Sequence, residues 1–254
     1  VSGDGRRWIL LNASPDLRAQ IAAAPALRPN GEVRGSPIAA VVLTGAEVDQ
    51  TAGLLHLREG HAFTLYGPAD TLDILDSNPI FAALDPALVA RRRVSFGAPF
   101  DTAGDLAVEL FGVPGKVPLY LEGGAAAADL EAAAAGVEVR RGGARLVFVP
   151  ACAAVTPELK ERLAAADLVL FDGTLFTDDE MIRAGAGPKT GRRMGHLPID
   201  GPDGSLAALA GLRNRRFYIH INNTNPVLIA GSPERAKVEA AGWEVAADGL
   251  EIAL

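Results

Sequence analysis

Residues 41–55 read VVLTGAEVDQTAGLL, and this stretch decides how the rest of the chain is interpreted. The apolar, β-branched run Ile38–Leu43 leads into it and predicts a short strand buried on both faces. The pattern that follows predicts a helix over Gln50–Glu59, with a sharp loop between strand and helix. Glu47 and Asp49 lie in that loop. Because layered α/β proteins bind ligands at loops that follow strands, both carboxylates are candidates for binding a metal ion or a substrate.

The composition is that of a globular protein with one large domain or two small ones. The 254 residues are 49% hydrophobic and 22% charged. The net charge of -7 argues against a nucleic-acid partner, and no apolar run reaches the length of about 18 residues expected of a membrane span. The single cysteine, Cys152, excludes an intrachain disulfide and a structural zinc site made of several thiolates. It fits a reducing compartment, and no secretory signal pattern opens the chain, so we predict a cytoplasmic protein.

Two segments are expected to lie at the margins of the fold. The chain opens on Val1 rather than on Met, and Trp8–Asn12 already reads as an interior strand, which predicts a fragment whose sheet lacks an edge strand. The alanine-rich segment 123–135 predicts a surface insertion.

Three further candidate site residues follow predicted strands or lie in an irregular loop. Asp172 ends a buried strand run and is either a site carboxylate or a turn residue beside Gly173. His220 lies near the end of the predicted strand Arg215–Ile221 and is either a ligand or a satisfied core histidine. His196 lies in the loop Lys189–Ile199, where a surface position is the alternative.

Polar side chains in two other loops could contact a substrate. Lys116 is the charged residue of a rigid turn between Pro114 and Pro118, and taken alone it reads as an exposed turn lysine. The last strand is followed by an asparagine-rich loop suited to Asx turns, which contains Asn222, Asn223 and Asn225.

The donor atoms in these loops indicate the kind of metal. Asp49, His220 and either Asp172 or Glu47 would form an oxygen-rich site with one imidazole. Such a set suits Fe(II) or Mn(II) better than a tight zinc site. A hydrolytic two-metal centre needs more ligands than these.

The opening stretch resembles the metal-binding loop of the metallo-β-lactamase superfamily, Thr-His-x-His-x-Asp-His-x-x-Gly. Asp49 and Gly53 are kept, whereas Gly45, Glu47 and Gln50 stand where the superfamily has histidines. This loop and three more segments are similar to the coenzyme PQQ biosynthesis protein B (PqqB) family. The segments are LLNASPDLR at 10–18, MGHLPI at 194–199 and HINNTNPV at 220–227.

The resemblance covers nearly the whole chain and implies its architecture. We expect a mixed α/β, four-layer αββα sandwich of metallo-β-lactamase type, as a single domain over residues 1–254. The N-terminal strand and the Cys-rich zinc-binding segment of the PqqB family would be missing, so this fragment would hold no structural zinc site.

The resemblance also implies an activity in biosynthesis of pyrroloquinoline quinone (PQQ). The expected reaction is an iron- and O2-dependent hydroxylation of the tyrosine of a Glu-Tyr-derived precursor. The implied Fe(II) ligands are Asp49, Gln50 and His220, with Zn(II) as the other candidate metal. Gln50 departs from the family histidine and offers only a neutral amide oxygen, which implies weakened metal binding.

Other positions receive roles from the same resemblance. It implies that His196 moves protons and that Lys116 or the loop Asn222–Asn225 holds carboxylates of the precursor. We also expect that two chains can form a homodimer. Two alternatives stay open. The protein could be a non-catalytic binding or carrier protein for PQQ or its precursor, or a metal-dependent hydrolase of esters or phosphodiesters.

Overall fold

The computed structural model describes the chain from residue 1 to residue 254, except for residues 30, 32 and 117–133. The described residues divide into two compact units, one made of 1–111 and 139–142, the other of 112–116, 134–138 and 143–254. The predicted insertion over 123–135 lies almost entirely outside the described residues. The prediction of a single domain stays a prediction.

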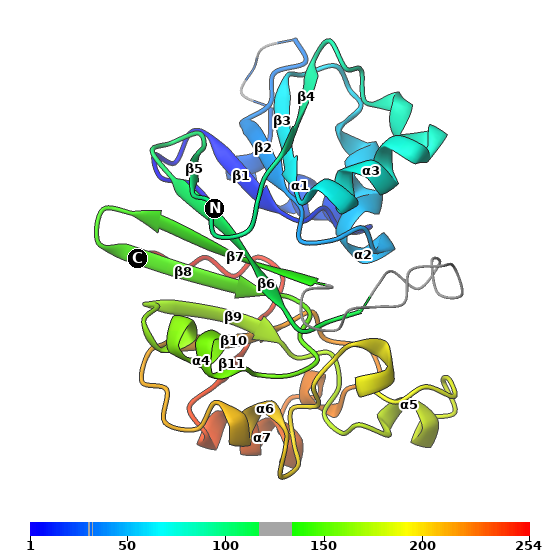
Figure 1. Cartoon of the computed structure of the whole chain (residues 1–254), viewed down its shortest axis with the longest axis vertical. Helices are drawn as coiled ribbons and strands as arrows, with labels where there is room; N and C mark the ends of the chain where they lie inside the picture. The colour runs from blue at the N-terminus through cyan, green and yellow to red at the C-terminus, as the bar shows by residue number, and fades with distance from the viewer. Residues whose placement is uncertain (30, 32, 117–133) are drawn as a thin grey trace. The chain divides into compact units, whose positions relative to one another are not determined.

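The first unit holds a four-stranded sheet whose order follows the chain, β1-β2-β3-β4, with every neighbouring pair parallel. Its helices are drawn beside this sheet in Figure 1. Their apolar side chains, such as Leu54 and Leu72, pack with Leu43 and Leu65 in one buried core. The elements are β1 (Trp8–Leu11), α1 (Leu17–Ala23), β2 (Ile38–Val42), α2 (Val48–Thr51), β3 (Phe63–Gly67), α3 (Ala69–Ser77) and β4 (Val89–Arg93), with the 3-10 helices η1 (Pro25–Leu27), η2 (Ala52–Leu57) and η3 (Pro79–Ala83).

The strand predicted over Ile38–Leu43 is confirmed as β2, but the helix predicted over Gln50–Glu59 is wrong in length. Regular α-helix ends at Thr51, and the chain continues as the tighter helix η2. The reason lies at Gly53, whose N–H donates to the carbonyl of Ala13 at 2.9 Å. A Cβ at this position would lie 2.2 Å from the backbone oxygen of Ser14. Gly53 therefore lets this part of the helix contact residues 13–14 closely, and regular α-helix does not continue there.

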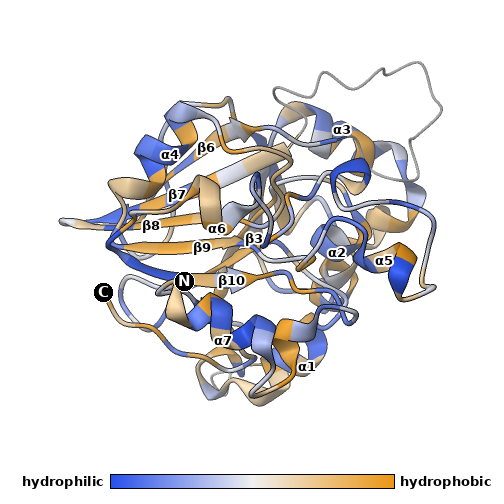
Figure 2. Ribbon diagram, turned by 90° about the horizontal axis from the view of Figure 1, so that it is seen from below, coloured by the Kyte–Doolittle hydropathy of each residue, from blue (hydrophilic) through white to orange (hydrophobic). Residues whose placement is uncertain are grey.

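The second sheet has seven strands in the order β11-β10-β9-β8-β7-β6-β5. Strands β8 to β11 run parallel, and β5 pairs antiparallel with β6. Figure 2 colours β8 and β9 mostly as hydrophobic, as expected of strands covered on both faces. The strands are β5 (Phe100–Asp101), β6 (Ala107–Val113), β7 (Ala134–Arg141), β8 (Ala144–Val149), β9 (Leu168–Asp172), β10 (Arg215–Ile219) and β11 (Glu244–Val245).

Short helices follow the strands of the second unit. Thr156 caps α4 by accepting a hydrogen bond from the N–H of Leu159 at 3.2 Å, and Ser232 caps α7 in the same way. Among the described residues, no helix is long and apolar enough to cross a membrane. The helices are α4 (Pro157–Ala164), α5 (Glu180–Arg183), α6 (Ser205–Ala208) and α7 (Pro233–Ala240), with the 3-10 helices η5 (Arg192–Met194) and η6 (Pro226–Leu228).

The register of β9 and β10 positions the candidate site. Asp172 is the last residue of β9 and pairs with Ile219, the last residue of β10. His220 follows directly. Because parallel neighbours end at the same edge of the sheet, a carboxylate and an imidazole from segments far apart in sequence are brought together.

Candidate metal centre

The carboxylate of Asp172 is fully buried at the end of β9. Within the described part of the chain it accepts four hydrogen bonds. Oδ2 accepts from the backbone N–H of Cys152 at 2.9 Å and faces Nδ1 of His196 at 2.8 Å. Oδ1 accepts from the backbone N–H of Thr174 at 3.1 Å and from its hydroxyl at 2.6 Å. A buried charge with this many donors is held in one orientation.

Two histidines complete the group. His196 comes from the loop after η5, and His220 follows β10, with ring centroids 5.4 Å apart and planes inclined by 23°. One ligand atom each from Asp172, His196 and His220 lie within 4.8 Å of one another. His220 has a left-handed backbone with φ 53°, which is uncommon for a residue with a Cβ and is found at functional sites.

The hydroxyl of Thr174 lies among these three side chains. Its Oγ1 is 2.6 Å from Asp172 Oδ1, 3.0 Å from His196 Nδ1 and 2.8 Å from His220 Nδ1. These are hydrogen-bond distances, whereas a Zn–N bond is about 2.0–2.1 Å long. The donor set of two imidazoles and one carboxylate suits a divalent transition metal. In this structure the Thr174 hydroxyl occupies the space among Asp172 Oδ1 and the two Nδ1 atoms.

The electrostatics keep the carboxylate charged. Burial by itself raises the pKa of Asp172, but the charge and hydrogen bond of His196, with His220 and Thr174, outweigh burial and lower it below its ordinary value. Burial, together with the charge of Asp172, raises the pKa of the Cys152 thiol far above its ordinary value. Cys152 therefore contributes a backbone N–H to the site, and its thiol stays protonated.

Hydrogen bonds of Asn225 fix the asparagine-rich loop after His220. Asn225 is buried, donates to the carbonyl of Gly173 at 2.9 Å and accepts from the N–H of Val227 at 3.0 Å, so its amide fixes the loop. Asn222 donates to the hydroxyl of Thr224 at 2.8 Å, whereas Asn223 is exposed.

Glu180 supports the same loop from α5. It is buried, accepts from Thr224 at 2.5 Å, and its other oxygen accepts from the N–H of Phe176 at 2.7 Å. From sequence, a carboxylate in the first turn of a helix reads as an exposed side chain that complements the helix dipole, so the pattern gave no sign of this role.

The carboxylates and amide of the central loop lie in the first unit, where they shape the start of α2. The Glu47 side chain accepts from the N–H of Gln50, and Gln50 Oε1 accepts from the N–H of Glu47 at 3.1 Å, which makes a capping box. The Gln50 amide also donates to Thr44 at 3.3 Å. Asp49 is an acidic residue in the first helical turn. Because the single side-chain oxygen of Gln50 already accepts a hydrogen bond in this cap, the capacity of Gln50 as a metal ligand is reduced. The metal-binding roles of Glu47, Asp49 and Gln50 remain predictions.

Lys116 belongs to the second unit and lies against Gly195, the neighbour of His196. A Cβ on Gly195 would come within 2.8 Å of the lysine Cγ, and the glycine has φ 86°. Only a glycine combines this backbone with room for the lysine stem. The structure thus brings Lys116 to the loop of His196, and its role as a substrate contact stays a prediction.

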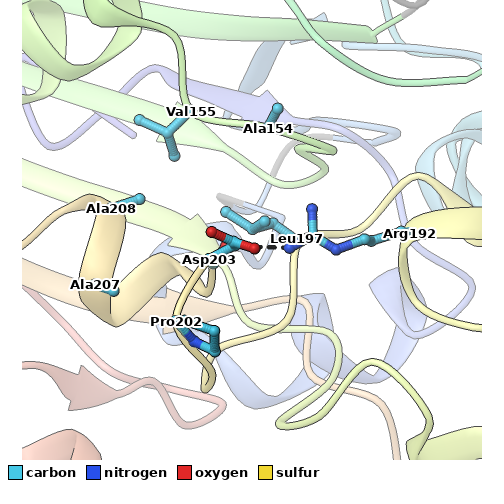
Figure 3. A pocket seen from close by; sticks show the side chains of 8 residues that line it. All are labelled: Ala154, Val155, Arg192, Leu197, Pro202, Asp203, Ala207 and Ala208. Atoms are coloured by element: carbon cyan, nitrogen blue, oxygen red, sulfur yellow. Dashed lines mark hydrogen bonds between the residues drawn. The ribbon is translucent and has the colours of Figure 1, made fainter.

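A hollow of ≈ 340 Å³ lies next to this loop, lined by Ala154, Arg192, Leu197 and Asp203 among others. Figure 3 shows the Arg192 and Asp203 side chains at this hollow, and Arg192 donates to the Asp203 carbonyl at 3.2 Å. Leu197 adjoins His196, but none of the three candidate ligands lines the hollow.

Sequence reasoning missed Thr174. A small hydroxyl residue after Asp172-Gly173 reads as part of a turn, and only the tertiary contacts with two distant histidines give it significance. The signal that could have found it is its place, two residues beyond the end of a buried strand, where α/β proteins put site residues.

Comparison with known proteins agrees with this architecture. Residues 7–221 match the family model described as "Beta-lactamase superfamily domain". Coenzyme PQQ synthesis protein B of Methylobacterium nodulans is 51% identical over 256 aligned residues, which cover 100% of this chain and 86% of that protein. Its counterpart from Xanthomonas campestris pv. campestris is 52% identical over 258 residues, with the same shares covered.

A solved structure gives the same result in three dimensions. The crystal structure of Zn2+-bound PqqB from Methylobacterium extorquens is 50% identical in sequence and superposes with a TM-score of 0.95, covering 100% of this chain and 86% of that one. The predicted metallo-β-lactamase fold class is thereby confirmed.

Proposed function

Because this chain belongs to the β-lactamase superfamily and, within it, to the coenzyme PQQ synthesis protein B family, we propose that it is a metal-dependent oxygenase of PQQ biosynthesis. The proposed reaction is the hydroxylation of the tyrosine ring of a Glu-Tyr-derived precursor, with Fe(II) as the metal and O2 as the oxygen source.

The observation that carries the proposal is the group Asp172, His196 and His220. The two imidazoles and one carboxylate are arranged as a candidate ligand, His220, beside a second imidazole, His196, that is paired with the buried Asp172 carboxylate. They lie at the carboxyl ends of parallel strands and in a loop beside them, the usual place of an active site in a layered α/β protein.

The two histidines receive different roles. His220 would hold the ion, because it follows the strand directly and its backbone is fixed in the left-handed conformation. His196 would move protons, because its contact with the buried Asp172 carboxylate at 2.8 Å orients the ring as in a carboxylate–histidine pair. A bound Fe(II) ion supplies the redox chemistry with O2.

The hydroxylation sets the proton balance that His196 would serve. One oxygen atom enters a ring C–H bond and the other leaves as water, which requires two protons and two electrons. The electrons come from an external reductant. Transfer of a proton at Nε2 of His196 is compatible with Nδ1 facing Asp172 Oδ2.

The precursor carries carboxylates, and the proposed contacts for them are Lys116, Asn222 and Asn223. Lys116 lies against the His196 loop, and Asn223 is an exposed amide three residues after His220. Both are therefore close in the chain or in space to a histidine of the candidate centre.

Other predicted site residues receive weaker support. Asn225 would act indirectly, by fixing the loop through Gly173. The proposal that Asp49, Gln50 and Glu47 also bind the metal rests on the sequence pattern alone.

One observation favours a second candidate function, a carrier that binds PQQ or its precursor without turnover. Gln50 stands where the family pattern has a histidine, and its amide oxygen is used in a capping box. If this position is needed for tight iron binding, the fold would keep the ligand site and lose the chemistry.

Turnover distinguishes the two functions. The protein is reconstituted with Fe(II) and incubated with a Glu-Tyr precursor peptide, a reductant and 18O2, and the product is analysed by mass spectrometry. The oxygenase proposal predicts one 18O atom in the tyrosine ring, and loss of that product in His220→Ala but not in His56→Ala, a histidine of the first unit. Tight binding of the peptide without labelled product, with or without iron, would support the carrier instead.

A further inference from the structure

We propose that Thr174 is a positioning residue that fixes the proton of His220 on Nδ1 and so makes Nε2 the atom that binds metal. The inference rests on the proposed function, because it concerns the same site. The Thr174 hydroxyl lies between the carboxylate of Asp172 and the imidazole of His220 and connects them by hydrogen bonds. It neither binds metal nor moves a proton itself.

The argument begins with the single proton of the hydroxyl. Oγ1 of Thr174 lies 2.6 Å from Asp172 Oδ1 and 3.0 Å from the carbonyl oxygen of His220. The carboxylate oxygen is the closer acceptor, and it also accepts from the backbone N–H of Thr174 at 3.1 Å. The proton therefore points to Asp172, and the lone pairs of Oγ1 remain to accept hydrogen bonds.

His220 supplies the donor for one of these lone pairs. Its Nδ1 lies 2.8 Å from Thr174 Oγ1, and with the hydroxyl proton directed elsewhere this contact is a hydrogen bond only if Nδ1 carries a proton. A neutral imidazole with its proton on Nδ1 has its lone pair on Nε2. The tautomer of His220 thus follows from the orientation of one threonine hydroxyl.

The same reasoning applies to His196 by a different route. Its Nδ1 faces Asp172 Oδ2 at 2.8 Å, and this oxygen is an acceptor, because it also receives the backbone N–H of Cys152 at 2.9 Å. His196 therefore also carries its proton on Nδ1. The carboxylate orients one ring directly and the other through Thr174, an arrangement in which a single buried charge sets both tautomers.

The backbone keeps the hydroxyl in place. The N–H of Gly173 donates to the carbonyl of Ile219 at 2.8 Å, and the N–H of Asn222 donates to the carbonyl of Thr174 at 3.0 Å, so the segments of Thr174 and His220 are tied on both sides of the contact. Thr174 is itself buried. Such fixed partners orient a metal-binding histidine, and their removal typically weakens metal binding about 10–100-fold.

Two substitutions separate the hydroxyl from the shape of the side chain. Thr174→Val keeps the volume and removes the acceptor, which leaves a buried Nδ1–H of His220 without Oγ1. Thr174→Ser keeps the hydroxyl and removes a methyl group. The valine variant is expected to change the tautomer of His220, whereas the serine variant preserves it.

The direct test is NMR of metal-free protein labelled with 15N in the histidine rings, in which two-bond couplings distinguish Nδ1–H from Nε2–H. Signals are assigned with His196→Gln and His220→Gln. Wild type and Thr174→Ser should show His220 with the proton on Nδ1, and Thr174→Val should show a substantial Nε2–H population. A wild-type His220 with its proton on Nε2 overturns the inference even if no variant folds, and so does a valine variant with an unchanged tautomer.

Metal affinity gives the second readout. In Zn2+ titrations, Thr174→Val should bind about 10–100-fold more weakly than wild type, and Thr174→Ser within about threefold of it. Equal affinities of wild type and the valine variant would overturn the role in metal binding. If the tautomers are as stated but the loaded wild type forms no hydroxylated product, the proposed function fails and the assignment of Thr174 stands.

Discussion

Replacing Asp172 by asparagine removes the buried charge and keeps the shape of the side chain. In the native site both carboxylate oxygens accept, and each receives one backbone N–H, from Cys152 on one side and from Thr174 on the other. An asparagine NH2 group must face one of these backbone donors in either orientation of the amide. The variant therefore loses at least one backbone hydrogen bond inside the protein.

The size of the effect follows from these contacts. A buried N–H without an acceptor costs about 1–3 kcal/mol, and each remaining hydrogen bond loses roughly 1 kcal/mol when its acceptor is no longer charged. The lower desolvation cost of a neutral amide offsets part of this loss. We expect Asp172→Asn to lower the free energy of unfolding by about 2–4 kcal/mol, which a domain with about 5–15 kcal/mol of stability survives.

Urea unfolding measures this change. Trp243 is buried in the same unit as Asp172, with its ring stacked on Tyr218 at 4.2 Å, so its fluorescence reports the unfolding of that unit. Asp248→Asn is the matched control, because Asp248 is exposed, and it should change the unfolding free energy by less than about 0.5 kcal/mol.

The pH dependence of the unfolding free energy gives a second test of the Asp172 contribution. The pKa of Asp172 is lowered in the folded protein, so its ionisation stabilises the fold at pH values above its ordinary pKa of about 3.9, and this stabilisation is lost as the pH falls through the lowered value. The difference between wild type and Asp172→Asn should be largest near neutral pH and smaller near pH 3. A difference below about 1 kcal/mol at pH 7, or one that grows as the pH falls, would refute the reasoning.

Three other predictions concern the surroundings of the site. Asn225→Ala removes the hydrogen bonds to Gly173 and Val227 and should lower the unfolding free energy by about 2 kcal/mol in urea; an unchanged midpoint would contradict it. Cys152, whose pKa is raised by burial, should resist Ellman's reagent at pH 8 until urea unfolds the protein, and rapid labelling of native protein would argue against this. Gly173→Ala places a Cβ 2.8 Å from the Cβ of Tyr218 and should cost about 1–3 kcal/mol in the same urea assay; a neutral effect would show that the neighbour moves freely.

The strands that carry the site could be predicted because their signal is local. The apolar run of β9 is short, buried and bounded by turn residues, and β10 carries the buried Phe217 and Tyr218, so the sequence placed Asp172 and His220 at the ends of their strands. The register of β9 and β10 then brings the two residues together, because Ile219 pairs with Asp172 and the two parallel strands end at the same level.

The parts that could not be predicted depend on contacts between distant segments. The pairing of His196 with Asp172 joins a loop without regular period to a strand end, and no spacing in the sequence encodes it. Thr174 is uninformative until both imidazoles are placed around its hydroxyl. Gln50 stands three residues after Glu47, the spacing of a capping box, but a glutamate is not the usual first residue of that motif, and the helix was predicted to begin at Gln50.

The measurement that tests the central claim most directly is an anaerobic Fe(II) titration of this chain beside His220→Ala and Gln50→His. The account predicts that the wild-type chain binds one Fe(II) ion and that His220→Ala abolishes the binding. If His220→Ala binds as tightly as wild type, His220 does not hold the metal. If only Gln50→His binds iron, the oxygenase proposal is contradicted, and the protein is a binding protein on an inherited enzyme fold.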